Sequence, residues 1–265
     1  GLRFNFINGG TSGLMSNVKI RKAISYSIDR EEMIDAVYGR YNPAYSYVAP
    51  AITFNGSSYR SQVGEVIEDE YNEYVGDPDK IVALFQEGLD ELGVETPIED
   101  ITLTYLTSGS TTEVQAEREY IQQSLEETLG LTVELSVAGD NSLFIADRNE
   151  GNYDFFLGGW YSDYNDPLDF LYTNYTDAYG MSFGGYSNTD YDALADQLVG
   201  ETDMDKRLDI YKQMEQILLL DDCAFAPIYY ATKQVLLQNW VKDYRTSSFG
   251  ASAEFIWTYI DGKNQ

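Results

Sequence analysis

Residues 101–137 read ITLTYLTSGSTTEVQAEREYIQQSLEETLGLTVELSV and contain a strand, a helix and a second strand. In the first strand Ile101, Leu103 and Tyr105 alternate with threonines, which is the period of a half-buried strand. From 112 to 129 apolar residues recur at helical spacing, and Gly130 follows as a residue that commonly ends helices. Apolar and polar residues alternate again from 131 to 137. The stretch therefore predicts a β-α-β unit.

Further elements extend this unit on both sides. A helix near 141–149 and the apolar run 153–160 complete a β-α-β-α-β order, which predicts an α/β fold with a mixed, mainly parallel sheet flanked by helices. Segment 41–76 has no clear period and is expected to be irregular structure packed on the core. Pro227 predicts that strand 225–231 lies at an edge or begins there. More helices are expected at 17–28, from Asp29 through Val37, at 78–92 and at 203–220.

The composition excludes several classes of function. A net charge of −27 repels phosphate backbones, so nucleic-acid binding is disfavoured and cationic ligands are favoured. The chain has no histidine and a single cysteine, Cys223. Catalysis by Ser-His-Asp or Cys-His groups and the usual zinc sites are therefore excluded, and we expect neither a metal nor a cofactor.

The start of the chain does not have the pattern of a secretion signal. GLRFNFINGG, residues 1–10, lacks a basic region followed by an apolar one. We expect either that a signal was removed or that the chain is a piece of a longer protein. No run of 18 apolar residues occurs, so no membrane-spanning helix is expected.

Residues 158–167, GGWYSDYNDP, follow the predicted strand 153–160. In open α/β sheets ligands bind beyond the carboxyl ends of the strands, so this stretch predicts a cleft. Asp166 precedes a proline, which favours a helix cap over a ligand contact. For Asp163 we favour a role as an anchor for a cationic group. Trp160, Tyr161 and Tyr164 offer flat amphipathic surfaces.

Four ordered stretches resemble the family 5 extracytoplasmic solute-binding proteins, which bind oligopeptides and dipeptides. They are VKIRKAISYSIDREEMI (18–34), GWYSDYNDPLDFL (159–171), GYSNTDYDALADQL (185–198) and KRLDIYKQMEQILLLDDCAFAPIYY (206–230). The resemblance implies a type II periplasmic-binding-protein fold, in which two hinged lobes close like a venus flytrap. It also implies a bacterial, extracytoplasmic protein, either periplasmic or a cell-surface lipoprotein, that delivers peptides to an ABC transporter permease.

The resemblance further implies that residues 1–265 form the C-terminal lobe and that an N-terminal lobe is absent. Residues 1–10 and about 232–265 would lie near the hinge and contact that absent lobe. Asp163 would pair with the α-amino group of the peptide, while Tyr161 and Ser162 would offer backbone groups to it. Some relatives place a carboxylate-binding arginine where this chain has Leu157 or near Arg148; for Arg148 we favour a surface helix residue.

Other functions remain open on the sequence. The same fold can bind a nickel complex, haem, an oligosaccharide or a signalling peptide. A glycoside hydrolase would use two carboxylates, for which only Asp163 and Asp166 are close in sequence. These lie on one turn beside a predicted helix cap, so we expect a binding protein and no enzyme. A purely structural adhesive module is the third alternative.

Overall fold

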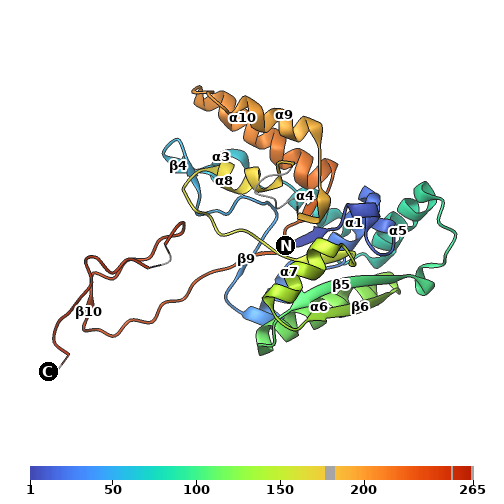
Figure 1. Ribbon diagram of the computed structural model, residues 1–265, viewed down its shortest axis with the longest axis horizontal. Coiled ribbons are helices and arrows are strands. Elements are labelled where there is room, and N and C mark those ends of the chain that lie inside the picture. Colours follow the sequence, from blue (N-terminus) through green and yellow to red (C-terminus); the bar gives the residue numbers. More distant parts are fainter. Residues whose placement is uncertain (177–182, 252, 264–265) are drawn as a thin grey trace.

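The computed structural model describes residues 1–176, 183–251 and 253–263 (Figure 1). Its centre is a five-stranded sheet in the order β6-β5-β7-β1-β8. The strands are β1 (Leu2–Phe4), β5 (Thr102–Ser108), β6 (Thr132–Ala138), β7 (Phe155–Leu157) and β8 (Phe225–Ala226). Strands β6, β5 and β7 are parallel, whereas β1 runs antiparallel to both β7 and β8. The sheet is therefore mixed and mainly parallel, as the sequence predicts.

Two helices cover opposite faces of this sheet. The connection through α6 (Thr112–Leu129) leads from β5 to its neighbour β6, and the connection through α7 (Asn141–Glu150) leads back across β5 to β7. Because such connections are right-handed, opposite directions of travel place the helices on opposite faces. Figure 1 shows α7 in front of β5 and α6 behind it.

The main predicted helices are present, and each begins at a capping side chain. The helices are α1 (Val18–Tyr26), α5 (Pro78–Leu92), α6 and α10 (Met204–Gln216), capped by Asn17, Asp77, Thr111 and Asp203. These side chains accept hydrogen bonds from amides of the first turn that would otherwise lack a partner. The others are α2 (Arg30–Met33), α3 (Tyr59–Val63), α4 (Glu68–Tyr74), α8 (Pro167–Leu171) and α9 (Thr189–Gln197).

Two predicted strands are shorter than expected. Within the predicted strand 153–160 only Phe155–Leu157 forms β7. At its start the carboxylate of Asp154 accepts the Thr104 amide at 2.7 Å in place of a backbone carbonyl. The predicted strand 225–231 divides at Pro227, which has no N–H for a ladder bond. Its first part is β8 at the sheet edge, and its second part, β9 (Tyr229–Tyr230), pairs with β2 (Asn42–Pro43).

Segment 41–76 is more ordered than the sequence indicates. It contains α3, α4 and a hairpin of β3 (Thr53–Phe54) and β4 (Ser57–Ser58), and it forms part of a second hydrophobic cluster with α8, α9 and α10. The first cluster lies between the sheet and α1, α5 and α6. The two clusters meet at Phe6 and Tyr45, which are half-buried against both.

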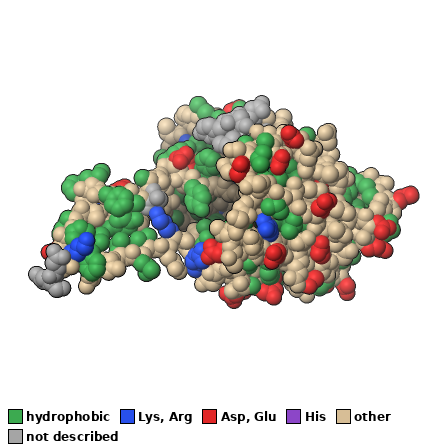
Figure 2. Space-filling model, turned by 60° about the horizontal axis from the view of Figure 1, so that its bottom comes forward, with side chains coloured by type: hydrophobic (Ala, Val, Ile, Leu, Met, Phe, Trp, Pro, Cys, Tyr) green, Lys and Arg blue, Asp and Glu red, His purple; other side chains and the backbone are tan. Residues whose placement is uncertain are grey.

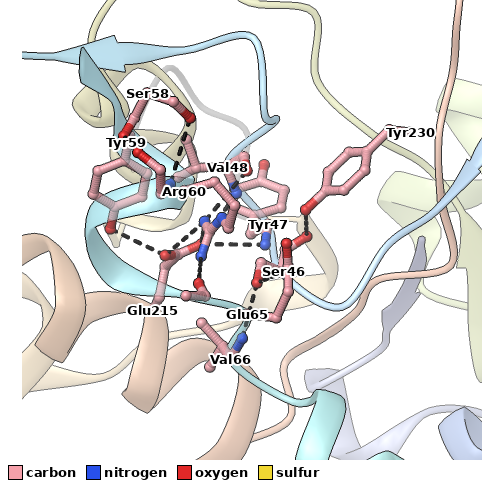
Figure 3. A network of polar contacts seen from close by, with 12 residues as sticks. Ser46, Tyr47, Val48, Ser58, Tyr59, Arg60, Glu65, Val66, Glu215 and Tyr230 are labelled. Atoms are coloured by element: carbon pink, nitrogen blue, oxygen red, sulfur yellow. Dashed lines mark hydrogen bonds and ion pairs between the residues drawn. The ribbon is translucent and has the colours of Figure 1, made fainter. Parts of the chain in front are cut away.

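A buried ion pair joins segment 41–76 to α10. Arg60 on α3 and Glu215 on α10 point toward each other (Figure 3), with a shortest N–O distance of 2.7 Å. Glu215 is fully buried and also accepts hydrogen bonds from the amides of Tyr47 and Val48 and from the Tyr59 hydroxyl. Five donor–acceptor contacts thus converge on one carboxylate. The long segment is therefore held by a specific polar network as well as by hydrophobic contacts.

Beyond β9 the chain leaves the globular body as an extended segment, 232–263, which we call the C-terminal arm (Figure 1). Within the arm, β10 (Val241–Lys242) pairs antiparallel with β11 (Tyr259–Ile260). The arm exposes many large hydrophobic side chains, and Leu236 is 99% exposed. Others with more than half of their surface exposed are Phe255, Ile256, Trp257, Tyr259 and Ile260.

Gly88 sets the close approach of α1 and α5. A Cβ at this position would lie 2.6 Å from Cγ1 of Ile20 and 2.8 Å from Oδ1 of Asn17. Gly88→Ala is therefore expected to lower the free energy of unfolding by up to about 2 kcal/mol, because strain of as much as about 3 kcal/mol exceeds the helix-propensity gain of about 1 kcal/mol. Urea denaturation measures this loss. The exposed neighbour Gln86, changed to alanine, is the control and should stay within about 0.5 kcal/mol; equal values for both variants would contradict the close approach.

Candidate ligand-binding site

The loop 158–166 follows β7 at the edge where β5, β6 and β7 have their carboxyl ends, and we call it the site loop. It ends at Asp166, whose Oδ1 accepts the Leu168 amide at 2.9 Å and so caps α8. The Tyr211 hydroxyl donates to the same Oδ1 at 2.8 Å. The preferred interpretation of Asp166 as a helix cap is thus confirmed.

Asp163 lies in the middle of the site loop with its side chain exposed. Within the described ranges its carboxylate has no hydrogen-bond or ion-pair partner. Its backbone amide, in contrast, donates to Oδ2 of Asp169 at 3.0 Å. The loop therefore holds the backbone of Asp163 and leaves the negatively charged group available.

The aromatic residues of the site loop differ in exposure. Trp160 is half-buried against the second hydrophobic cluster, and its Nε1 donates to Oδ2 of Asp169 at 3.0 Å. Tyr161 is 86% exposed, and Tyr164 is exposed to a lesser degree. Trp160 therefore serves partly as core, whereas the ring of Tyr161 is exposed on the surface, and a role for either residue in ligand binding stays a prediction.

Ser162 is buried and makes contacts on both of its oxygen atoms. Its hydroxyl donates to the Tyr164 carbonyl at 2.6 Å, which closes a tight turn around Asp163. Its carbonyl accepts the Gly250 amide of the C-terminal arm at 2.7 Å. One of the backbone groups predicted to meet a ligand is thus occupied by the arm in this structure, while its role toward a peptide stays a prediction.

The outer side of the site loop is fixed to the β3–β4 hairpin. Asn165 accepts the Thr53 amide at 2.8 Å and donates to the Thr53 hydroxyl at 2.6 Å. A depression of about 480 Å³ lies between this hairpin and the start of α10 and is lined by Asn165, Asp166 and Arg207 among others. Asp163 is not among its lining residues. A hollow is visible between the globular body and the C-terminal arm in Figure 2.

Arg148 is not brought together with the site loop. It lies in the last turn of α7, which begins after the carboxyl end of β6 and ends before the amino end of β7. This helix of ten residues is about 15 Å long, so Arg148 lies toward the opposite edge of the sheet from Asp163. One nitrogen of its guanidinium donates to Oδ1 of Asn149 at 3.5 Å. A role for Arg148 in carboxylate binding stays a prediction.

Asp169 is the residue of the site that the sequence interpretation missed. It is 6% exposed and joins Trp160 and Asp163 through one oxygen. The sequence offered one sign of Asp169, a carboxylate three residues after a helix cap. On its own this pattern indicates only that a negative charge is favourable near the start of a helix.

We also searched the described residues for metal ligands, a reactive thiol and membrane-spanning helices. No group of three or more acidic or cysteine side chains that could hold a metal ion occurs among them. Burial raises the pKa of the Cys223 thiol to about 11, which disfavours the nucleophilic thiolate. Among the helices that the structure describes, none combines the length and apolar character needed to cross a membrane.

Comparisons with known proteins agree with one another. A family model, the bacterial extracellular solute-binding proteins, family 5 middle region, matches residues 1–182. The oligopeptide-binding protein OppA of Bacillus subtilis is 31% identical over 237 residues, which are 86% of this chain and 39% of that protein. The structure of Listeria monocytogenes OppA bound to peptide superposes with a TM-score of 0.77 at 31% identity, covering 98% of this chain and 48% of that one.

A further similar structure is an oligopeptide ABC transporter substrate-binding domain from Bacillus anthracis, with a TM-score of 0.82 at 24% identity, covering 98% of this chain and 48% of that one. These structures confirm the predicted fold, a lobe of the type II periplasmic-binding-protein kind. The chain spans about two-fifths of the length of the B. subtilis relative. Because the family model covers more than half of the chain, we conclude that this chain belongs to family 5 of the bacterial extracellular solute-binding proteins.

Proposed function

We propose that this chain is the C-terminal lobe of a protein that captures extracellular peptides for an ABC importer, and that Asp163 anchors the peptide's α-amino group. The observation that carries the proposal is the exposed Asp163 carboxylate, which has no partner in the described residues and lies beyond the end of a central strand. A carboxylate held in this way forms a strong charge-assisted hydrogen bond with an ammonium group. The relatives named for oligopeptide binding support the choice of ligand.

The surroundings of Asp163 suit a peptide. Main-chain groups of the site loop, chiefly those of Tyr161, would bind the peptide backbone without regard to its side chains. The rings of Trp160, Tyr161 and Tyr164 would cover its apolar parts. The net charge of −27 adds a long-range attraction for a positively charged amino terminus.

The second lobe would close over the site loop, and the closed form would dock on the permease outside the cytoplasm. The C-terminal arm would contact this second lobe, together with Ile7 and Asn8, which are exposed. Leu2–Phe4 are enclosed in the sheet between β7 and β8 and are not available for that contact. Support comes from the hydrophobic side chains that the arm exposes and from the scarcity of acidic side chains on it relative to the globular body (Figure 2). Of the predicted contact segment, about 232–265, residues 252, 264 and 265 lie outside the described residues.

Calorimetry on a two-lobed protein that carries this chain tests the proposal. We expect a tripeptide with a free amino terminus to bind and its N-acetylated form to bind at least about tenfold more weakly, because acetylation removes the charge that Asp163 would meet. The isolated 265-residue chain should bind either peptide weakly, since it would hold half of the cleft. Equal affinity for both peptides would refute the amine anchor. Tight binding of haem or an oligosaccharide with no peptide binding would refute the proposed ligand.

A further inference from the structure

A single buried oxygen ties together the two ends of the Trp160–Asp163 stretch. Oδ2 of Asp169 accepts the Trp160 indole N–H and the Asp163 backbone N–H, each at 3.0 Å. Of these three residues, only Asp163 has an exposed side chain. The oxygen thus connects the half-buried ring at the start of the stretch with the backbone that carries the exposed carboxylate.

Asp169 is itself held firmly. Its backbone amide donates to the Asp166 carbonyl at 3.1 Å inside α8, and Asp166 is bonded through its side chain to Tyr211 of α10. Tyr211 is fully buried in the second hydrophobic cluster. The position of the Asp169 carboxylate is therefore set by α8 and by the contact of its cap residue with α10.

We propose that Asp169 is the positioning residue that fixes the direction of the Asp163 carboxylate for binding an amino terminus. This inference rests on the function proposed above. Because the Asp163 side chain makes no bond of its own within the described residues, its direction depends on the backbone at this position. That backbone is restrained by the Asp169 bond on one side and by the turn that Ser162 closes on the other. Binding groups held in place before the ligand arrives lose less entropy on binding.

Two other roles of Asp169 predict different outcomes. Asp169 could act only through Trp160, by holding the indole; Trp160→Phe, which keeps an aromatic ring and removes the N–H donor, would then reproduce the effect of losing Asp169. Asp169 could also act only through its negative charge; Asp169→Asn, which keeps an oxygen acceptor and removes the charge, would then be as harmful as Asp169→Ala. Positioning predicts that Asp169→Ala is clearly the most harmful of the three.

The test measures peptide affinity for the two-lobed protein and its variants by calorimetry, with a free-amine tripeptide and its N-acetylated form. For Asp169→Ala we expect about a tenfold loss for the free-amine peptide and less than about threefold for the acetylated one, as for the loss of one hydrogen bond to a charged group. Asp169→Asn should retain affinity within about threefold of the parent protein. In the Asp163→Asn background, Asp169→Ala should have little further effect, because the two residues act as a unit.

The outcomes separate this inference from the proposed function. If the parent protein does not discriminate between the two peptides, or Asp163→Asn has no effect, the proposed function fails and this inference fails with it. If the parent protein discriminates between the peptides and Asp163→Asn weakens binding, but Asp169→Ala keeps the discrimination, only this inference is overturned. Melting curves of each variant show whether it is folded, and the amide resonance of Asp163 reports loss of the Asp169 bond without any ligand. A folded Asp169→Ala variant with an unchanged Asp163 amide resonance would also overturn the inference.

Discussion

Glu215→Ala is expected to lower the free energy of unfolding by about 3–5 kcal/mol, since removing one member of a buried ion pair leaves the other charge uncompensated. Here the uncompensated group is the Arg60 guanidinium, which is 7% exposed. The same change leaves the amides of Tyr47 and Val48 without their acceptor. Segment 41–76 should loosen first, because these contacts fix it to α10. Urea denaturation measures the loss, and hydrogen exchange at Tyr47 and Val48 localises it.

The control is Glu87→Ala at a salt bridge on the surface. Glu87 contacts Lys19 at 2.8 Å but keeps 60% of its side chain exposed, so the same substitution should cost at most about 1 kcal/mol. If Glu215→Ala cost no more than Glu87→Ala, the network in Figure 3 would be irrelevant to stability.

Asp163→Asn is expected to weaken binding of a free-amine peptide to the two-lobed protein about 30-fold, or about 2 kcal/mol. The substitution keeps the shape of the side chain and removes the charge, so a charge-assisted hydrogen bond becomes a neutral one. The N-acetylated peptide should lose little affinity, since it brings no positive charge to this position. The protein should keep its melting temperature within about 2 °C, because the exposed carboxylate has no partner in the described residues. Calorimetry and thermal melting measure the two quantities.

Asp166→Asn is the matched control for this experiment. Asp166 lies in the same loop, but it caps α8 and accepts from Tyr211. Asparagine keeps an oxygen acceptor for both bonds and is an equally good helix cap, so this change should leave the preference for a free amine intact. If Asp166→Asn abolished that preference while Asp163→Asn left it intact, the anchor would have been assigned to the wrong carboxylate.

Local signals in the sequence predicted most of the helices. The cap at Asp77, the glycine at 130 and the Asp166-Pro167 pair each act within a few residues, so the chain reveals them without any tertiary information. The β5-α6-β6 unit was equally visible, because both strands alternate and the helix between them is long.

The rest depends on contacts between residues distant in sequence. Arg60 and Glu215 are 155 positions apart, and neither position has a pattern that indicates a partner. The order of the segment 41–76 escaped prediction for this reason. The role of Asp169 was not predicted either, because Trp160 and Asp163 contact its carboxylate only after the site loop has folded back over α8. The exposure of the Asp163 carboxylate, by contrast, could be predicted, because the residue lies in the loop that follows a buried strand.

The position of β1 also affects when the protein can finish folding. Leu2 pairs with Leu157 on one side and with Ala226 on the other, so the middle of the sheet joins residues that emerge from the ribosome far apart in time. Until residue 226 has been synthesised, β1 lacks one neighbour and its edge stays open. Strand pairings over such separations close slowly, because a long loop must be ordered first. The central sheet therefore stays incomplete until that late strand has been made, and the unpaired edge of β1 is exposed for that interval.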